Sequence, residues 1–86
     1  MNPKPDYQLM FLKVERDFAE LDRNNLQKKL TEAKCLLSRL AFLSAPDSEI
    51  ICAKIQIRTI EKQLHKAMDR LNELRAQVSE LDWSQA

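Results

Sequence analysis

The chain has 86 residues, of which 44% are hydrophobic and 31% charged, and its net charge is +1. A chain of this length forms at most one domain with a small core. It contains no glycine, so tight hairpins and glycine-rich phosphate loops are disfavoured. The small net charge provides no overall field to attract nucleic acid or an anionic membrane. The composition therefore predicts long helices.

The predicted organisation begins with an extended arm over residues 1–6. Pro3 and Pro5 lack amide protons, and Asp6 stands where it can cap a helix that begins at Tyr7. No signal-peptide core follows the arm, and the apolar run 9–12 is too short to span a membrane. We therefore expect a cytoplasmic protein.

The first predicted helix covers residues 7–43. Its apolar residues recur about every 3.6 residues, the period of a straight helix. One irregular step contains Asn24 and Asn25, where either a continuous helix with a weak point or a break capped by Asn24 is possible. The absence of glycine and proline favours continuity. The stripe comprises Tyr7, Phe11, Val14, Phe18, Leu21, Leu26, Leu30, Ala33, Leu37 and Leu40.

Residues 44–47 are predicted to form a turn. Pro46 is incompatible with a helix interior but suits the first turn of a new helix. Ser44 with Asp47 resembles a capping box, and Asp47 and Glu49 place negative charge at the new helix N-terminus. The chain therefore divides into two helices of similar length.

The second predicted helix covers residues 47–83, and residues 84–86 are predicted to be a tail. Within this helix, ten consecutive positions spaced by three and four residues are all apolar. That spacing is the 3.5-residue repeat of a coiled-coil seam. The ten residues are Ile50, Ala53, Ile57, Ile60, Leu64, Ala67, Leu71, Leu74, Val78 and Leu81.

The short connection predicts that the two helices pack as an antiparallel hairpin. Residues whose numbers sum to about 90 then face each other, which also places Phe18 near Leu71 and Phe11 near Val78. A parallel dimer of the second helix is disfavoured because it sets Arg70 against Arg75. The predicted fold is an all-α, coiled-coil-like helical hairpin. Its predicted seam is Leu26, Leu30, Ala33, Leu37, Leu40, Ile50, Ala53, Ile57, Ile60, Leu64, Ala67 and Leu71.

A single hairpin seam buries little apolar surface, so we expect the hairpin to complete a helical bundle by association. Several apolar residues lie off the seam near the turn and near the open end, and such surface usually marks an interface. The alternative is that they only thicken the hairpin's own core. The residues predicted to bind a partner are Met10, Leu12, Leu36, Phe42, Leu43, Ile51 and Ile55.

The sequence shows no pattern typical of chemistry. His65 is the sole histidine, and Cys35 and Cys52 do not provide the four ligands of a structural zinc site or a disulfide framework. The carboxylates are spaced along a helix with basic residues, as on a solvated face. We therefore expect neither a metal nor a cofactor, and we expect no enzymatic activity.

A basic band is the main rival to a protein-binding function. It runs across both helices near the turn, where phosphate contacts are conceivable. Glu61, Asp69 and Glu73 interrupt it, and no aromatic side chain is interleaved for base stacking. Weak nucleic-acid binding is therefore a second alternative only. The basic residues are Lys28, Lys29, Lys34, Arg39, Lys54, Arg58, Lys62 and Lys66.

Two heptad-rich helices around Ser44-Ala45-Pro46-Asp47 give the whole chain a shape that resembles the small helical-hairpin co-chaperones of bacterial type III secretion. Those proteins pair with a helical-repeat partner and hold a needle subunit soluble. The resemblance implies a co-chaperone role as an alternative to the main expectation, a protein-interaction and assembly module that self-associates or completes a heteromeric bundle.

Overall fold

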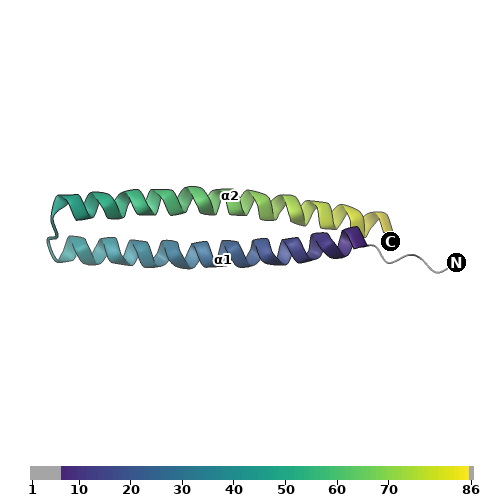
Figure 1. Ribbon diagram of the computed structural model, residues 1–86, viewed down its shortest axis with the longest axis horizontal. Coiled ribbons are helices and arrows are strands. Elements are labelled where there is room, and N and C mark those ends of the chain that lie inside the picture. Colours follow the sequence, from purple (N-terminus) through teal and green to yellow (C-terminus); the bar gives the residue numbers. More distant parts are fainter. Residues whose placement is uncertain (1–6, 86) are drawn as a thin grey trace.

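A computed structural model describes residues 7–85, which form two long helices joined by a short turn (Figure 1). Helix α1 spans Tyr7–Phe42 and helix α2 spans Asp47–Gln85. They lie side by side and antiparallel, with the turn at one end and the start of α1 beside the end of α2 at the other (Figure 1). The predicted all-α helical hairpin is confirmed. The predicted arm over residues 1–6 lies outside the described residues, as does residue 86.

Helix α1 continues without interruption through Asn24 and Asn25. The Oδ1 atom of Asn24 accepts hydrogen bonds from Nε and Nη2 of Arg23, at 3.2 and 2.9 Å. The Asn24 side chain therefore bonds to its neighbour and does not cap a new helix. Of the two possibilities left open by the sequence, the structure has the continuous helix.

Helix α1 ends in a Schellman motif. Ser44 has a φ of 53°, the left-handed conformation that reverses the chain after a helix. The Ala45 N–H donates to the Leu40 carbonyl at 2.9 Å, and the Ser44 N–H donates to the Ala41 carbonyl at 3.2 Å. Ser44 therefore terminates α1, and the capping box predicted for it with Asp47 is wrong. With no glycine in the chain, a small serine takes the left-handed position.

Helix α2 begins directly after Pro46. The Pro46 carbonyl accepts hydrogen bonds from the N–H groups of Glu49 and Ile50, at 3.0 and 3.2 Å. Proline needs no partner for a missing N–H at this position, and its fixed φ suits a helix start. The carboxylates of Asp47 and Glu49 lie in the first turn, where they interact favourably with the helix dipole.

At its other end α2 runs past the predicted boundary at residue 83. Ser84 and Gln85 belong to the helix, and the Ser84 hydroxyl donates to the Leu81 carbonyl at 3.0 Å. No glycine or proline follows Trp83 to stop the helix, so the last described residues remain helical rather than forming the predicted tail.

The core is a single seam between the two helices, and its buried residues form two clusters. Near the turn, Ala33, Ile57 and Ile60 pack together with Leu30 and Leu37. Towards the open end, Ala19, Leu71 and Leu74 pack together with Leu12, and the two leucines of α2 are only 1% exposed. The structure places all twelve predicted seam residues in buried or half-buried positions.

The first half of α1 is rotated relative to the prediction. Five apolar residues that were expected to face α2 are 51 to 73% exposed, namely Tyr7, Phe11, Val14, Phe18 and Leu21. Leu9 and Ala19 are buried in their place, and Leu12 packs beside them. The pairing of Phe18 with Leu71 and of Phe11 with Val78 is therefore wrong.

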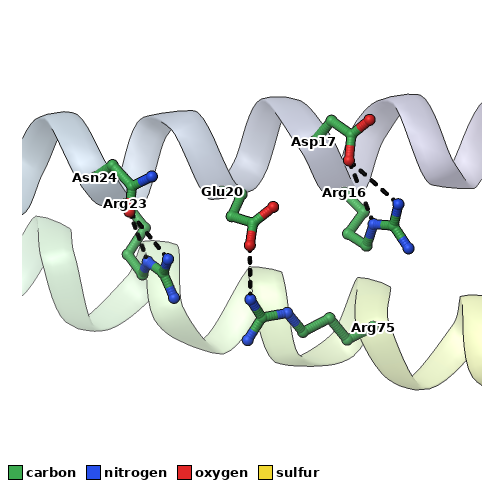
Figure 2. A network of polar contacts seen from close by, with 6 residues as sticks. All are labelled: Arg16, Asp17, Glu20, Arg23, Asn24 and Arg75. Atoms are coloured by element: carbon green, nitrogen blue, oxygen red, sulfur yellow. Dashed lines mark hydrogen bonds and ion pairs between the residues drawn. The ribbon is translucent and has the colours of Figure 1, made fainter.

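The 3.5-residue repeat of the seam explains this rotation. Positions 9, 12, 16, 19, 23, 26, 30, 33, 37 and 40 follow steps of three and four along all of α1, the same 3.5-residue repeat as in α2. Arg16 and Arg23 occupy two of these positions and are half-buried. Figure 2 shows both side chains on the α2-facing side of α1, each bonded to the residue that follows it. Long arginine stems cover apolar surface while the guanidinium stays near water.

Ion pairs along the edges of the seam show which residues of the two helices lie at the same height. Arg75 Nη2 lies 2.9 Å from Glu20 Oε1 (Figure 2), and Arg70 Nη2 lies 3.4 Å from Glu15 Oε2. Lys13 Nζ lies 3.7 Å from Asp82 Oδ1. The residue numbers of these pairs sum to 85 or 95, on either side of 90. Exposed pairs of this kind contribute about 0–1 kcal/mol each, so the apolar seam provides most of the stability.

We predict that Ile60→Asp abolishes the hairpin. Ile60 is 8% exposed in the turn-end cluster, and a carboxylate there is buried without a partner, which costs several kcal/mol. Far-ultraviolet circular dichroism should show loss of most of the helical signal. Gln63→Asp places the same side chain at an exposed position of the same helix and should retain the signal. Full helicity in the Ile60 variant would contradict the assignment of the seam.

Candidate functional site

The first half of α1 carries a second apolar stripe on the side opposite the seam. We call Tyr7, Phe11, Val14, Phe18 and Leu21 the outer stripe; the spacing of its residues is four, three, four and three. Its members are exposed by 73, 64, 51, 65 and 54% in that order. Heptad spacing on a helix face is the pattern that packs against another helix. Helix α1 therefore has two seams, and α2 covers only one of them.

Acidic residues border the outer stripe. Glu15, Asp17 and Asp22 lie along its two edges, and Met10, which is 58% exposed, widens it near the start of the helix. The basic residues of this half of α1 are Lys13, Arg16 and Arg23, which are half-buried towards α2. The outer side of α1 is thus apolar along its centre and has carboxylates along its edges, of which Asp17 pairs with Arg16 and Glu15 pairs with Arg70.

A second group of exposed apolar residues surrounds the turn. Phe42 is 87% exposed and Leu43 66%, and on α2 Ile51 and Ile55 are 55 and 59% exposed. Leu36 is less open, at 43%. These five residues were predicted to bind a partner, and they do lie on the outside of the hairpin.

The structure places one predicted partner-binding residue elsewhere. Leu12 is half-buried and packs against Ala19, Leu71 and Leu74. It belongs to the seam because the seam follows a 3.5-residue repeat through the first half of α1. We therefore exclude Leu12 from the candidate surface.

The outer face of α2 next to the turn combines apolar and basic side chains. Ile51 and Ile55 line a shallow surface hollow together with Lys54, Arg58, Thr59 and Lys62. We call residues 51–66 of this helix the basic face, because it holds four basic residues and only one acidic residue, Glu61. Like the outer stripe it has apolar residues, Ile51 and Ile55, but the charged side chains around them are basic and not acidic.

The basic residues near the turn have no ion-pair partner within the described part of the chain. All cross-helix ion pairs there involve residues 13–20 of α1 and 70–82 of α2, at the open end. The unpaired basic residues are Lys28, Lys29, Lys34, Arg39, Lys54, Arg58, Lys62 and Lys66. This half of the hairpin therefore presents free positive charge.

The outer stripe escaped the sequence prediction because α1 contains two overlapping heptad patterns. The pattern through Tyr7 and Phe11 is purely apolar, whereas the pattern through Leu9 and Leu12 contains two arginines, so a count of apolar residues selects the first. The signal that distinguishes them is continuity: only the second pattern joins Leu26 and the rest of the seam without an irregular step. Trp83, which is 84% exposed at the open end, was also not singled out.

The remaining polar candidates lie apart from one another on the surface. His65 Nε2 is 3.8 Å from Asp69 Oδ2 on the same helix, and both side chains are well exposed. Cys35 and Cys52 are exposed free thiols. Residues 7–85 bring together no group of three histidine, cysteine or acidic side chains that could hold a metal ion. Within the same range, neither helix is long and apolar enough to cross a membrane.

Comparison with models of known families, with characterised proteins and with solved structures gave no match. The functional argument therefore rests on the surface itself.

We predict that Arg23→Leu stabilises the hairpin. Arg23 occupies a seam position near Ala67 in the register, and a leucine there buries more apolar surface without a charge to keep solvated. The free energy of unfolding should rise by about 1–2 kcal/mol in a urea titration followed by circular dichroism. Lys28→Leu, at an exposed position of the same helix, should change it by less than about 0.5 kcal/mol. A less stable Arg23 variant would contradict the seam position of this residue.

Proposed function

We propose that this hairpin is a non-catalytic protein-interaction and assembly module. Its exposed apolar faces are covered by one or more helices of a partner, either a second copy or another protein, so that a helical bundle forms. The observation that carries this proposal is the outer stripe: five large apolar side chains at heptad spacing on one helix face, each more than half exposed.

The spacing of the outer stripe separates it from ordinary surface hydrophobicity. Single exposed apolar side chains are common on folded proteins. Here three aromatic and two aliphatic side chains are aligned along about four helical turns, and full burial of such a side chain contributes about 1.5–3 kcal/mol. Aligned residues of this kind act together because one partner helix can cover them all.

The architecture supports the same conclusion. A helix that packs between two neighbouring helices needs two apolar faces, whereas a helix in an isolated hairpin needs only one. The first half of α1 has two such faces, and the first part of α2 adds Ile51 and Ile55 outside its seam. The apolar pattern is thus that of a bundle subunit.

A co-chaperone role is one form of this proposal. The shape resembles the hairpin co-chaperones of type III secretion, and an exposed helical stripe is suited to holding a helical client. Under this alternative the covering helix belongs to a different protein, and the chain alone remains monomeric or poorly folded. The mass of the purified chain distinguishes the two alternatives: a dimer indicates that a second copy covers the stripe, and a monomer indicates a different protein.

Nucleic-acid binding is a second candidate, supported by the eight unpaired basic residues near the turn. Phosphate contacts of this kind weaken steeply as salt is raised. A salt-dependent mobility shift with duplex DNA or RNA would support it, and the outer stripe would then have no part in binding.

We predict that Phe11→Ser plus Phe18→Ser removes the partner interaction without unfolding the hairpin. Both rings are about two-thirds exposed, so the seam does not depend on them. Light scattering over a hundredfold concentration range should show a lower mass if the partner is a second copy. Capture experiments with the tagged chain should show loss of the bound protein if the partner is different.

The matched control is Lys28→Ser plus Lys34→Ser, which changes two exposed residues of the same helix outside the apolar surfaces. It should leave mass, helicity and capture unchanged. If the double phenylalanine variant behaves like this control in all three measurements, the outer stripe is no interface and the proposal fails.

A further inference from the structure

We infer that the outer stripe of α1 packs against the outer stripe of a second copy of this chain, with the two α1 helices antiparallel. This inference rests on the proposed function and specifies its partner. A two-fold axis relates the copies, so both hairpins use the same surface. The helices then lie in the order α2, α1, α1 and α2, and each α1 is covered on two sides.

The position of the outer stripe makes this contact accessible. Its five side chains lie on the side of α1 opposite the seam, and each is more than half exposed. Helix α2 therefore does not stand between two facing stripes. A second hairpin can approach the first half of α1 from outside and needs no contact with the outer side of α2.

The spacing of the stripe reads the same in both directions once Asn25 is included. From Tyr7 to Asn25 the steps are four, three, four, three and four, and Asn25 is exposed. Residues that face each other in an antiparallel pair have numbers with a constant sum, which is about 90 within the hairpin. A sum of 32 gives every member of this series a counterpart in the second copy. The facing pairs are Tyr7 with Asn25, Phe11 with Leu21, and Val14 with Phe18.

These pairs combine side chains of different size. Phe11 meets Leu21 and Phe18 meets Val14, and alternation of large and small side chains favours close packing. At each end the Tyr7 hydroxyl lies opposite the side-chain amide of Asn25, a group that both donates and accepts hydrogen bonds. A register shifted by one heptad has a sum of 25 and leaves Leu21 without a counterpart in the series.

The edges of the stripe accommodate this contact because a basic group lies beside the carboxylates that it brings together. In the hairpin, the cross-helix ion pairs have sums five above or five below that of the seam. The same offset sets Glu15 beside Asp22 of the second copy at one edge, and Asp17 beside Met10 at the other. The Nη2 atom of Arg70 lies 3.4 Å from Glu15 Oε2. Arg70 therefore offsets the repulsion between Glu15 and the Asp22 that approaches it.

The area of the contact is that of a reversible dimer. The five side chains are 51 to 73% exposed. An aromatic side chain buries about 150–250 Å² in full, so the stripe exposes roughly 600 Å² in one copy. Two facing stripes thus remove about 1,200 Å² from water, the lower end of the range for specific interfaces. We expect a dimer that dissociates on dilution.

The first test completes the apolar series. Asn25→Leu should lower the Kd of the dimer about tenfold, because the new side chain is buried twice in the symmetric contact. Sedimentation equilibrium measures the Kd. Ser38→Leu adds the same side chain at an exposed position of α1 beyond the contact and should leave the Kd within about twofold. An unchanged Kd in the Asn25 variant would overturn the register.

The second test removes the basic group at the edge. Arg70→Gln should raise the Kd about fivefold, because it leaves Glu15 and Asp22 facing each other at both symmetric edges. Adding Asp22→Asn should restore the Kd. The control is Arg75→Gln, which removes the ion pair with Glu20 outside the contact and should leave the Kd unchanged. Equal Kd values for the Arg70 and Arg75 variants would contradict the proposed edge.

The third test uses the two native cysteines, which are exposed. Spin labels on Cys35 in a Cys52→Ser variant, and on Cys52 in a Cys35→Ser variant, report distances between copies. A sum of 32 separates the two Cys35 positions by about 57 Å along the axis and the two Cys52 positions by about 66 Å, at ~1.5 Å per residue. A parallel pair sets each label at equal height, within roughly 40 Å, the width of four helices. Short distances for both labels would overturn the antiparallel arrangement, and distances about 10 Å longer than expected would overturn the register.

The outcomes separate this inference from the proposed function. A chain that is helical but monomeric at every concentration overturns the second-copy inference. If its capture of another protein is still lost in the Phe11→Ser plus Phe18→Ser variant, the interaction module stands with a different partner. If that variant changes neither mass nor capture, both fail.

Discussion

The shared 3.5-residue seam between α1 and α2 is the constraint on which the rest of the structure depends. Helix α2 is apolar at all ten seam positions, so it accepts α1 along its full length provided that α1 keeps the same period. In its first half α1 keeps that period only by turning Arg16 and Arg23 towards α2. The arginines are tolerated because their guanidinium groups remain at the edge, bonded to Asp17 and Asn24 (Figure 2). Continuity of the seam thus outweighs local apolar burial.

The exposed outer stripe is the direct consequence. A straight helix could turn Phe11 and Phe18 towards Leu71 and Val78, but its 3.6-residue period drifts away from the α2 seam. Packing Leu26, Leu30 and Ala33 against α2 fixes the rotation of the whole helix, which carries the aromatic side chains outward. A hairpin with so large an exposed apolar face is suited to packing against a further helix. The seam does not depend on these five residues, which are 51 to 73% exposed.

The sequence was sufficient for the fold class because α2 has an uninterrupted heptad pattern and the region around Pro46 stops the helix. It did not predict which side of the first half of α1 faces α2, because two heptad patterns overlap there. The pattern through Tyr7 and Phe11 is wholly apolar, yet the pattern through Leu9 and Leu12 is the one that lies in the seam. The long-range packing of Leu30 and Ala33 against α2 decides between them, and the ion pairs of Glu15 with Arg70 and of Glu20 with Arg75 agree with that register. Ser44 was misread for a related reason, since serine caps helix N-termini more readily than it takes a left-handed conformation. Of the candidate surface, the residues around the turn were predicted and the outer stripe was not.

Charge and apolar surface are distributed unevenly along the hairpin, and the two are linked. The basic residues in the first half of α1, Lys13, Arg16 and Arg23, lie in or beside the seam. The charged residues around the outer stripe are therefore carboxylates. Near the turn the seam is fully apolar, so the basic residues there remain outside and unpaired. The same choice of seam therefore produces a negative apolar face at one end and a positive one at the other. Two surfaces of opposite sign on one rigid rod cannot meet within a single hairpin, because the length of the rod separates them.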